Sequence, residues 1–283
     1  MRKSNIDLKT VEGFGDEWVR FDQSKLSEEE LLRRFKQYFS IFPFEYLSNK
    51  SIGFDMGCGS GRWAKLIAPQ VGMLHCIDPS SALKVAKKNL KKYSNCTFHN
   101  ASVDCLPMKD NSMDFGYSLG VLHHIPNPTQ GLQKCIEKLK PGAPFLLYFY
   151  YAFDDRPLWF KFIWSLSNFL RICISRLPHF ARYIVSQLIA ILIYLPLAYI
   201  SLILEKVGFN VKNIPLSFYR NTSFYSMRTD ALDRFGTRLE HRYSKKQIKQ
   251  MMEDSGLENI SFSSNMPYWC SLGFKKSAVG SDR

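Results

Sequence analysis

The segment from Ile52 to Trp63 constrains the fold of this chain more than any other. It reads IGFDMGCGSGRW: a short apolar run that ends on an acid, a turn with glycine at alternate positions, and the start of a helix. Glycines at that spacing allow positive φ and a close ligand, because no Cβ stands in the way. The free N–H groups at the start of the helix point at whatever binds there. The segment therefore predicts a strand–loop–helix site for a small, partly charged cofactor.

From Ser51 onward, apolar runs of strand length alternate with segments of helix length. Helices are predicted at 61–68, 80–92, 128–140 and 244–254, and strands at 51–56, 72–78, 95–100, 113–119, 143–150, 257–264 and 268–275. This order predicts an α/β fold, a Rossmann-like doubly wound sheet of seven strands that is mostly parallel and ends in an antiparallel hairpin. Ligands of such sheets bind beyond the C-terminal ends of the strands.

The pattern divides the chain into four parts. They are an N-terminal lid and helix at 1–47, a cofactor-binding core at 48–151, a helical apolar and basic insertion at 152–240, and the last helix and strands at 241–283. We expect irregular chain up to about residue 26, and a helix that Ser27 opens as a capping box with Glu30. The segment with Phe14 and Trp18 is either a lid over the pocket or a terminus that these two rings pin to the core.

Composition limits which binding partners and which cellular compartment are expected. The formal net charge of +13 indicates an acidic partner, nucleic acid or an anionic membrane, although a generally basic soluble enzyme has the same excess. The seven cysteines are scattered and the N-terminal segment lacks the apolar stretch of a signal peptide, which together predict a cytoplasmic protein with reduced thiols. Cys96 and His99 have metal-ligand spacing but no second pair nearby, so no metal site is expected.

Acids follow the next strands as well. Asp78 ends the second predicted strand, at the distance from the glycine loop where nucleotide-binding α/β folds place a carboxylate on the ribose hydroxyls. Asp104 lies in the loop before the fourth strand, where an adenine amino group could donate to it. The loop spacing, Gly-x-Gly-x-Gly, differs from the dinucleotide fingerprint Gly-x-Gly-x-x-Gly. The expected ligand is therefore a nucleoside that need not carry a pyrophosphate.

Five motifs in this order resemble the class I S-adenosylmethionine-dependent methyltransferases. The resemblance is close over residues 48–150 and looser over 241–276, and it is strongest to the branch that includes the ubiquinone and menaquinone biosynthesis methyltransferases. The motifs are Asp55-x-Gly57-x-Gly59-x-Gly61, Asp78-Pro79-Ser80, Asp104-x-Leu106-Pro107, Met113-Asp114-Phe115 through Val121-Leu122-His123-His124-Ile125, and Leu139-Lys140-Pro141-Gly142.

The resemblance implies S-adenosylmethionine as the cofactor and gives roles to the acids. Asp55 would hold the ammonium group of the methionine part, Asp78 the ribose and Asp104 the adenine. Further contacts that the resemblance implies are Gly57, Cys58, Gly59 and Gly61 at the methionine part, Pro79 and Ser80 beside Asp78, the Val103 and Cys105 backbone at the adenine, and Ser118 and Leu119 on the methyl-donor side.

Methyl transfer from a sulfonium is an in-line displacement, in which alignment alone can contribute roughly 7–11 kcal/mol. A hydroxyl or enolisable carbon acceptor still benefits from a base. His123 and His124 follow the fourth strand, and either could take a proton, because imidazole titrates near neutrality. The alternative is that one histidine packs on the sheet and the other binds a loop. Candidates for acceptor contacts are Trp18, Asp230, Asp233 and Arg234.

Residues 152–240 should determine the acceptor. Within them, 183–204 is an uncharged run long enough to cross a bilayer. A single span would leave the last helix and strands on the far side of the membrane from their sheet, and Pro196 interrupts the run. We expect helices that lie in the membrane interface, with a helical cap buried in protein or true spans as alternatives. The cations expected to face lipid phosphates are Arg156, Lys161, Arg171, Arg176 and Arg182.

The sequence thus predicts a cytoplasmic S-adenosylmethionine-dependent methyltransferase, peripheral to an anionic membrane, that acts on a hydrophobic or lipid-linked small molecule such as a quinone precursor, lipid or glycan. The alternatives are an RNA methyltransferase that uses the basic surface, or a non-catalytic S-adenosylmethionine-binding subunit of a membrane complex. Two features count against nucleic acid: the insertion lacks aromatic stacking platforms, and no Asn-Pro-Pro-Tyr-type motif follows the fourth strand. The lysines at 84, 87, 88, 91 and 92 form a stripe that is interpreted as a solvated helix face.

Overall fold

The computed structural model describes residues 4–154 and 156–277. Its centre is a seven-stranded sheet in the order β3-β2-β1-β4-β5-β7-β6. The first five strands are parallel, and β7 runs antiparallel to both β5 and β6. The predicted doubly wound sheet with its closing hairpin is confirmed. The strands are β1 (Ile52–Met56), β2 (Met73–Ile77), β3 (Cys96–His99), β4 (Phe115–Leu119), β5 (Pro144–Tyr148), β6 (Leu257–Phe262) and β7 (Cys270–Lys275).

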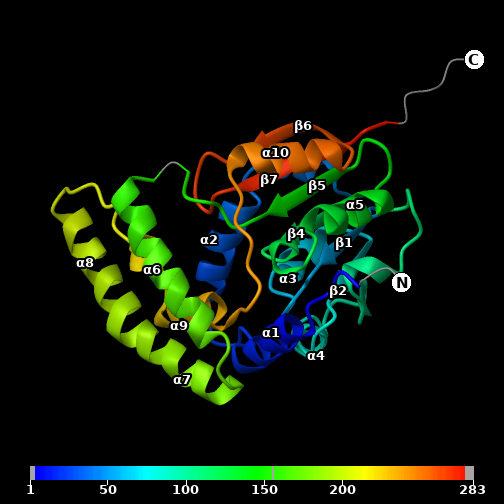
Figure 1. Ribbon diagram of the computed structural model, residues 1–283. Coiled ribbons are helices and arrows are strands. Elements are labelled where there is room, and N and C mark those ends of the chain that lie inside the picture. The colour runs from blue at the N-terminus through cyan, green and yellow to red at the C-terminus, as the bar shows by residue number, and fades with distance from the viewer. Residues whose placement is uncertain (1–3, 155, 278–283) are drawn as a thin grey trace, which may run out of the picture.

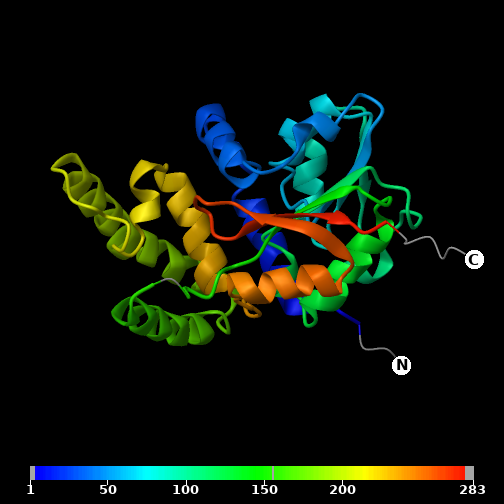
Figure 2. The same ribbon diagram turned by 90° about the horizontal axis from the view of Figure 1, so that it is seen from above.

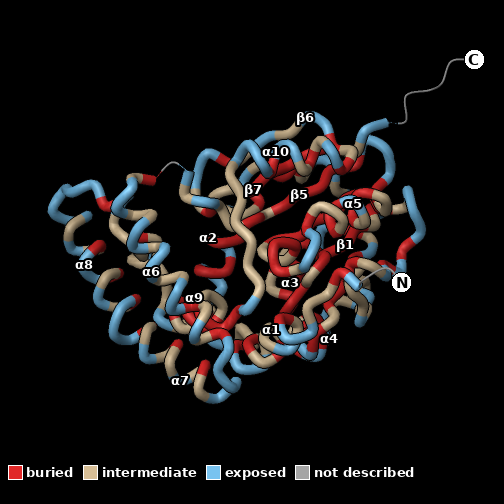
Figure 3. Tube along the Cα trace, viewed as in Figure 1, coloured by how far each residue is buried: buried red, intermediate tan, exposed pale blue. Residues whose placement is uncertain are grey.

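Helices cover both faces of this sheet (Figures 1 and 2). One core cluster joins the sheet to α2 (Glu28–Tyr38), α3 (Ala64–Ile67) and α4 (Ala82–Asn89), and a second joins it to α5 (Pro128–Lys138) and α10 (Lys245–Asp254). Buried residues fill the middle of the molecule, as the red segments of Figure 3 show. The C-terminal strand ends are therefore held rigidly from both sides.

The two central strands pack unusually closely. Gly53 pairs with Phe115 and Phe54 with Gly116 across β1 and β4. A Cβ on Gly53 would lie 2.2 Å from the Phe115 ring, and one on Gly116 would lie 2.4 Å from the Phe54 ring. Each ring thus occupies the space that a side chain on the partner glycine would need. Both rings are fully buried, so this packing fixes the strand that leads into the glycine loop.

The N-terminal segment differs from the prediction. Residues expected to be irregular form helix α1 (Leu8–Arg20), which Asp7 caps by accepting the Thr10 N–H at 2.8 Å. Gly15 lies against α4, where a Cβ would meet the Ser81 hydroxyl at 2.5 Å. A glycine inside a helix costs up to about 1 kcal/mol relative to alanine, and close packing on α4 offsets that cost here. Sequence periodicity alone could not show this contact.

The predicted capping box of α2 forms only in part. Ser27 accepts the Glu30 N–H at 3.2 Å, as expected. The Glu30 carboxylate instead accepts the Ser226 hydroxyl at 2.6 Å and the Ser223 N–H at 3.1 Å. Glu30 therefore ties α2 to the insertion, nearly two hundred residues further along the chain.

The insertion is helical, as predicted, and extends to one side of the sheet (Figure 1). Helices α6 and α7 pack against α9, which joins them to the core. Its elements are α6 (Leu158–Ile174), α7 (His179–Ile189), a π-helical turn (Ala190–Tyr194), α8 (Leu195–Lys206), a short 3-10 helix (Ser217–Asn221) and α9 (Phe224–Gly236).

The helical run His179–Lys206 is long and apolar enough to cross a membrane by length and composition, and it is the one such helix in the described ranges. Only 22% of its most apolar stretch is buried. However, β7 follows this run in the chain and pairs directly with β5, which precedes it. A single crossing would place these two paired strands on opposite sides of the membrane, so the sheet itself argues against one.

Candidate active site

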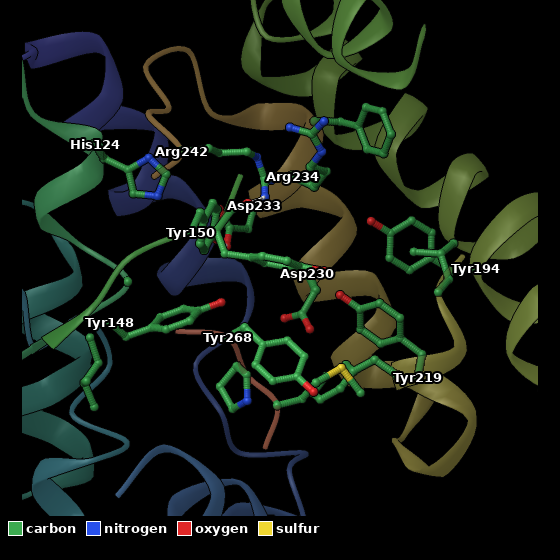
Figure 4. Close-up of a pocket in the computed structure, with 18 of the residues that line it drawn as sticks. His124, Tyr148, Tyr150, Tyr194, Tyr219, Asp230, Asp233, Arg234, Arg242 and Tyr268 are labelled. Atoms are coloured by element: carbon green, nitrogen blue, oxygen red, sulfur yellow. Dashed lines mark hydrogen bonds between the residues drawn. The ribbon is translucent and has the colours of Figure 1, made fainter. Parts of the chain in front are cut away.

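A cavity of about 670 Å³ lies at the C-terminal ends of the strands. One end of the cavity is lined by the glycine loop and the other by the insertion. Helix α1 and the loops after β4 and β5 form the walls between these two ends, so residues far apart in sequence share one space. Figure 4 shows part of this lining, including His124, Tyr148, Tyr150, Tyr194, Tyr219, Asp230, Asp233, Arg234, Arg242 and Tyr268.

The glycine loop has the backbone that its sequence predicts. Gly57, Gly59 and Gly61 all have positive φ, of 81°, 52° and 77°. The N–H groups of Gly57 and Cys58 both donate to the Ile77 carbonyl, at 2.8 and 3.0 Å, which fastens the loop to β2. A side chain on Gly59 would collide with the Trp18 indole, whose Nε1 lies 3.0 Å from the Cβ position. Trp18 of α1 therefore covers this loop and lines the cavity.

Asp78 connects the loop to the next strand. Its Oδ2 accepts the Gly59 N–H at 2.9 Å, and its Oδ1 accepts the Ser80 N–H at 2.8 Å and the Ser80 hydroxyl at 2.6 Å. Burial raises the pKa of the Asp78 carboxyl. These bonds fix both oxygens at the cavity wall, where vicinal hydroxyls can donate to them. Beyond Pro79 lies a second hollow, lined by Ser4, Ile6, Phe98, His99, Asn100, Ala101, Ser102, Cys105 and Pro107.

Two other predicted cofactor acids have different surroundings. Asp55 is 1% exposed and lies at the end of β1, outside the residues that line the cavity. Its Oδ2 has no hydrogen-bond partner among the described residues, and burial raises its pKa to about 8. Asp104 accepts the Asn5 N–H at 2.6 Å, so the N-terminal segment contacts the acid that was expected at the adenine. Val103 beside it is buried.

Ser118 and Leu119 end β4 but face different ways. Ser118 is fully buried, and its hydroxyl donates to the Met56 carbonyl at 3.0 Å inside the sheet. Leu119 lines the cavity together with Gly120 and Val121. Of this predicted pair, only Leu119 is placed where it can contact a bound molecule.

The structure also places the two predicted histidines in different surroundings. His123 is fully buried, lies outside the cavity lining, and its ring centroid is 4.0 Å from that of Tyr150. His124 lines the cavity, and its Nδ1 lies 2.7 Å from the Leu239 carbonyl, so Nδ1 donates and Nε2 is left as an acceptor. Burial lowers the pKa of His124 to about 4, and burial also lowers the pKa of His123 well below its usual range. Both rings are therefore neutral near pH 7, and only His124 faces the cavity.

The three predicted acceptor residues of α9 all line the cavity. Asp230 lies 3.5 Å from Arg34 of α2, and Arg234 is 3.0 Å from Glu240. Asp233 accepts the Tyr150 hydroxyl at 2.6 Å. Helix α9 thus turns a row of charged side chains toward the strand ends.

Two charged residues at the glycine loop were missed from the sequence. Glu17 is 3% exposed, and burial and then the nearby Asp233 and Asp230 carboxylates raise its pKa well above the usual range, although Arg62 opposes this. The Arg62 guanidinium lies 5.2 Å from the centre of the Trp18 ring. Arg62 directly follows the last loop glycine, which is a usable sequence signal. Glu17 was missed because α1 was expected to be irregular.

The comparisons with known proteins decide the family. The family described as "Methyltransferase domain" matches residues 54–147, which include the glycine loop, Asp78 and β4. The chain carries, at residues 54–147, a domain of the class I S-adenosylmethionine-dependent methyltransferases. Its cofactor is S-adenosylmethionine.

Curated relatives of this methyltransferase act on different acceptors. A tRNA (carboxymethyluridine(34)-5-O)-methyltransferase of Schizosaccharomyces pombe is 27% identical over 129 residues, which are 45% of this chain and 54% of that protein. A ubiquinone biosynthesis O-methyltransferase of Nitrosospira multiformis is 31% identical over 100 residues, 34% of this chain and 41% of that protein. The matches thus span about half or less of the relatives' own length.

A solved structure extends the likeness of fold over nearly the whole methyltransferase. One chain in the complex of the Haloferax volcanii Trm112 methyltransferase activator with a methyltransferase superposes with a TM-score of 0.55. It is 14% identical and covers 93% of this chain and 97% of that chain. At this identity the likeness concerns the fold alone, and it includes the regions outside the matched domain.

The residues of this methyltransferase fit S-adenosylmethionine. The positive-φ glycines leave room for a molecule against the backbone, whereas Asp55 lies outside the cavity lining, so its contact with the ammonium group stays a prediction. Asp78 presents fixed carboxylate oxygens to a ribose, and Arg62 in the cavity lining provides a positive charge for the carboxylate end of an amino acid. The roles of the individual residues remain predictions.

Replacing Glu17 with glutamine is expected to stabilise the unliganded methyltransferase against unfolding at pH 8 and to have little effect at pH 4. The folded pKa of Glu17 is raised above its ordinary value of 4.5, so ionisation above that pH costs folded-state stability. Below the ordinary value both states are protonated and the gain disappears. Thermal unfolding at pH 8 and pH 4 tests this. The exposed Glu258→Gln serves as the control, and equal effects of Glu17→Gln at both pH values would contradict the assignment.

Proposed function

We propose that this methyltransferase transfers the methyl group of S-adenosylmethionine to a hydrophobic or lipid-linked small molecule that enters from the cytoplasmic surface of an anionic membrane. One observation carries the proposal: the cavity that begins at Gly57 and Gly59 continues between Ile163 and Leu166 of α6 and Leu197 of α8. An apolar acceptor can thus extend from the cofactor end to helices that face outward.

The outer faces of these helices support membrane contact. Leu158 and Phe162 of α6 are 83% and 73% exposed, and Phe180 of α7 is 71% exposed. Isolated exposed apolar residues are ordinary, but a contiguous set marks an interaction surface. Helices that lie in a membrane interface bury such faces among the lipid headgroups. We call this set the apolar face: Leu158, Trp159, Phe162, Phe169, Phe180, Leu188, Leu192, Tyr199, Ile203 and Phe209, all exposed.

The predicted role of the insertion's arginines needs correction. Arg156, Arg171 and Arg182 are buried and donate to the carbonyls of Lys212, Thr237 and Gly236 at 2.6, 2.8 and 2.8 Å. They hold the insertion together and are not free to face lipid phosphates, because each guanidinium donates to loop or helix-end carbonyls inside the protein. Of the insertion's cations, Arg176, Lys206, Lys212 and Arg238 are exposed and can approach anionic headgroups.

A second candidate function is methylation of RNA. It is favoured by the likeness to a tRNA methyltransferase and by the exposed lysines on α4 and just after it, at 84, 87, 88, 91 and 92. Phosphate contacts of such lysines would give binding without sequence preference. The apolar face and the apolar far end of the cavity have no use in this function, which is why the lipid-linked acceptor is preferred.

Transfer of label separates these functions. The protein is incubated with methyl-tritiated S-adenosylmethionine and extract of its own host, which is then divided into lipid, soluble and RNA fractions. We expect label in the lipid fraction, and less of it when the extract is first stripped with organic solvent. Label in RNA alone would support the second function. Retained cofactor binding without label in any fraction would support a non-catalytic subunit instead.

A further inference from the structure

A half-buried tyrosine–aspartate pair lines the cavity in which the proposed acceptor would meet the cofactor. Tyr150 lies two residues beyond β5 and Asp233 lies on α9, and both line the cavity. The Tyr150 hydroxyl donates to Asp233 Oδ2 at 2.6 Å. Figure 4 shows this pair between His124 and Asp230, on the wall that faces the open space. Leu119, which ends the neighbouring strand β4, and Gly120, which follows it, line the same cavity.

Asp233 has no ion-pair partner among the described residues, although arginines surround it. Arg234 and Arg242 both pair with Glu240, at 3.0 and 2.7 Å, and Arg34 lies 3.4 Å from Glu30 and 3.5 Å from Asp230. In the part of the chain that the structure describes, the Thr237 hydroxyl is the only donor to the Asp233 carboxylate besides Tyr150, at 3.4 Å. A buried carboxylate kept for stability is ordinarily paired with a cation. Asp233 thus keeps the capacity to accept a proton.

Burial and then the Asp233 carboxylate raise the pKa of the Tyr150 phenol well above its usual range, so Tyr150 keeps a proton near neutral pH and can act only by passing one on to Asp233. The Arg242 guanidinium lies 5.0 Å from the centre of the Tyr150 ring. A cation over an aromatic face is attracted to the electron-rich ring, and that attraction grows when the phenol loses its proton. The neutral His124, whose centroid is 5.4 Å from that of Tyr150, is the competing base. Its pKa of about 4 lies below the value of about 6 for Asp233, which burial raises, so Asp233 is the stronger proton acceptor.

We propose, on the basis of the proposed function, that the methyl acceptor is a hydroxyl group and that Tyr150 and Asp233 together take its proton. The acceptor oxygen attacks the methyl carbon, a C–O bond forms, and the C–S bond breaks with its electron pair left on sulfur. The hydroxyl proton moves to the Tyr150 oxygen while the proton of Tyr150 moves to Asp233. The products are a methyl ether, a neutral thioether and a neutral carboxylic acid.

This charge balance is the reason to prefer oxygen over nitrogen. The sulfonium and the carboxylate cancel each other's charge in the step, which is favourable in a cavity of low dielectric. A neutral amine has a free lone pair and needs no base during the displacement, so the pair would have no function there. A hydroxyl is a weak nucleophile until its proton is withdrawn, and a positioned base contributes typically 10²–10⁴-fold.

The first test compares Asp233→Asn and Tyr150→Phe with wild type, using tritiated cofactor and host lipid extract. Both variants are expected to bind the cofactor with unchanged affinity and to transfer label roughly 10²–10⁴ times more slowly. Exposed residues provide matched controls, Asp254→Asn and Tyr46→Phe, which should transfer at the wild-type rate. Tyr150→Phe removes one oxygen and keeps the ring contacts, so it also serves if Asp233→Asn folds poorly. Wild-type rates in Tyr150→Phe would overturn the proposal.

The pH dependence distinguishes a proton acceptor from a structural residue. Wild-type transfer should rise with pH through about 6, where the Asp233 carboxyl ionises, and this rise should be absent in Asp233→Asn. A rise that persists in Asp233→Asn would assign the titration to another group and overturn the role of Asp233. The charged and titratable groups that face Asp233 are Tyr150, Asp230, Glu240, Arg62 and Glu17.

The nature of the new bond is tested on the labelled product. Hot hydriodic acid cleaves a methyl ether and releases the label as volatile iodomethane, whereas C-methyl groups resist it and N-methyl groups require harsher heating. Volatile label supports a hydroxyl acceptor. Label that enters the lipid fraction but stays non-volatile overturns this inference and leaves the proposed function intact. Absence of label from every fraction overturns both.

Discussion

Replacing Asp78 with alanine is expected to weaken S-adenosylmethionine binding by roughly a hundredfold or more. The carboxylate is the acceptor proposed for two ribose hydroxyls, and hydrogen bonds to a charged group contribute about 1.5–3 kcal/mol each. Its loss also frees the Gly59 N–H, which Asp78 accepts at 2.9 Å, so the loop loses one of its anchors. Titration calorimetry with the cofactor measures the change.

Two controls make this prediction sharp. Asp254→Ala replaces an exposed carboxylate and should leave the dissociation constant unchanged. Asp104→Ala tests the other predicted cofactor acid, whose Oδ2 already accepts the Asn5 N–H. A large loss of affinity in Asp104→Ala with none in Asp78→Ala would transfer the main anchoring role from the ribose acid to the adenine loop.

The sheet could be predicted from the sequence because its signals are local. Each parallel strand is a short apolar run with a loop or a capped helix on either side. Apolar residues recur every 2 positions in a strand and every 3.6 positions in a helix, and this difference distinguishes the two kinds of element. The glycine loop was predictable for the same reason, since alternate glycines after a strand leave few other conformations. Residues that these rules place at strand ends, such as Asp78 and Leu119, do reach the cavity.

What could not be predicted depends on contacts between distant segments. Helix α1 contains two glycines that lower its intrinsic propensity, and its packing on α4 is not visible in its own sequence. His123 and His124 are adjacent, and only the fold decides that one is sealed in the core while the other lines the cavity. The buried arginines of the insertion seemed suited to lipid phosphates by type alone, but their partners are carbonyls some 50 to 70 residues away.

The apolar face gives the second large prediction. Replacing Phe162 and Phe169 of α6 with glutamate should lower binding to anionic liposomes by about a hundredfold or more. The two rings are 73% and 64% exposed and line no part of the cavity. Burying a phenylalanine contributes about 1.5–3 kcal/mol. The double substitution loses two such contributions and adds two anionic groups near anionic lipid. It therefore lowers the binding free energy by at least about 3 kcal/mol, which corresponds to the hundredfold loss of liposome binding.

Flotation with vesicles of phosphatidylglycerol and phosphatidylcholine measures this loss of binding. A control pair of exposed apolar residues elsewhere on the protein shows whether the loss depends on the position of the substitutions. Leu8 of α1 and Tyr46 are exposed to 66% and 55% but lie outside the insertion, so Leu8→Glu with Tyr46→Glu adds the same charge elsewhere. If only the α6 pair abolishes flotation while cofactor affinity stays unchanged, the apolar face is the membrane contact. Equal loss from both pairs would mean that net charge alone drives binding, because each pair lowers the formal charge of +13 by the same amount. Unchanged flotation in both would contradict membrane association through this face, and the acceptor would then have to reach the cavity from solution.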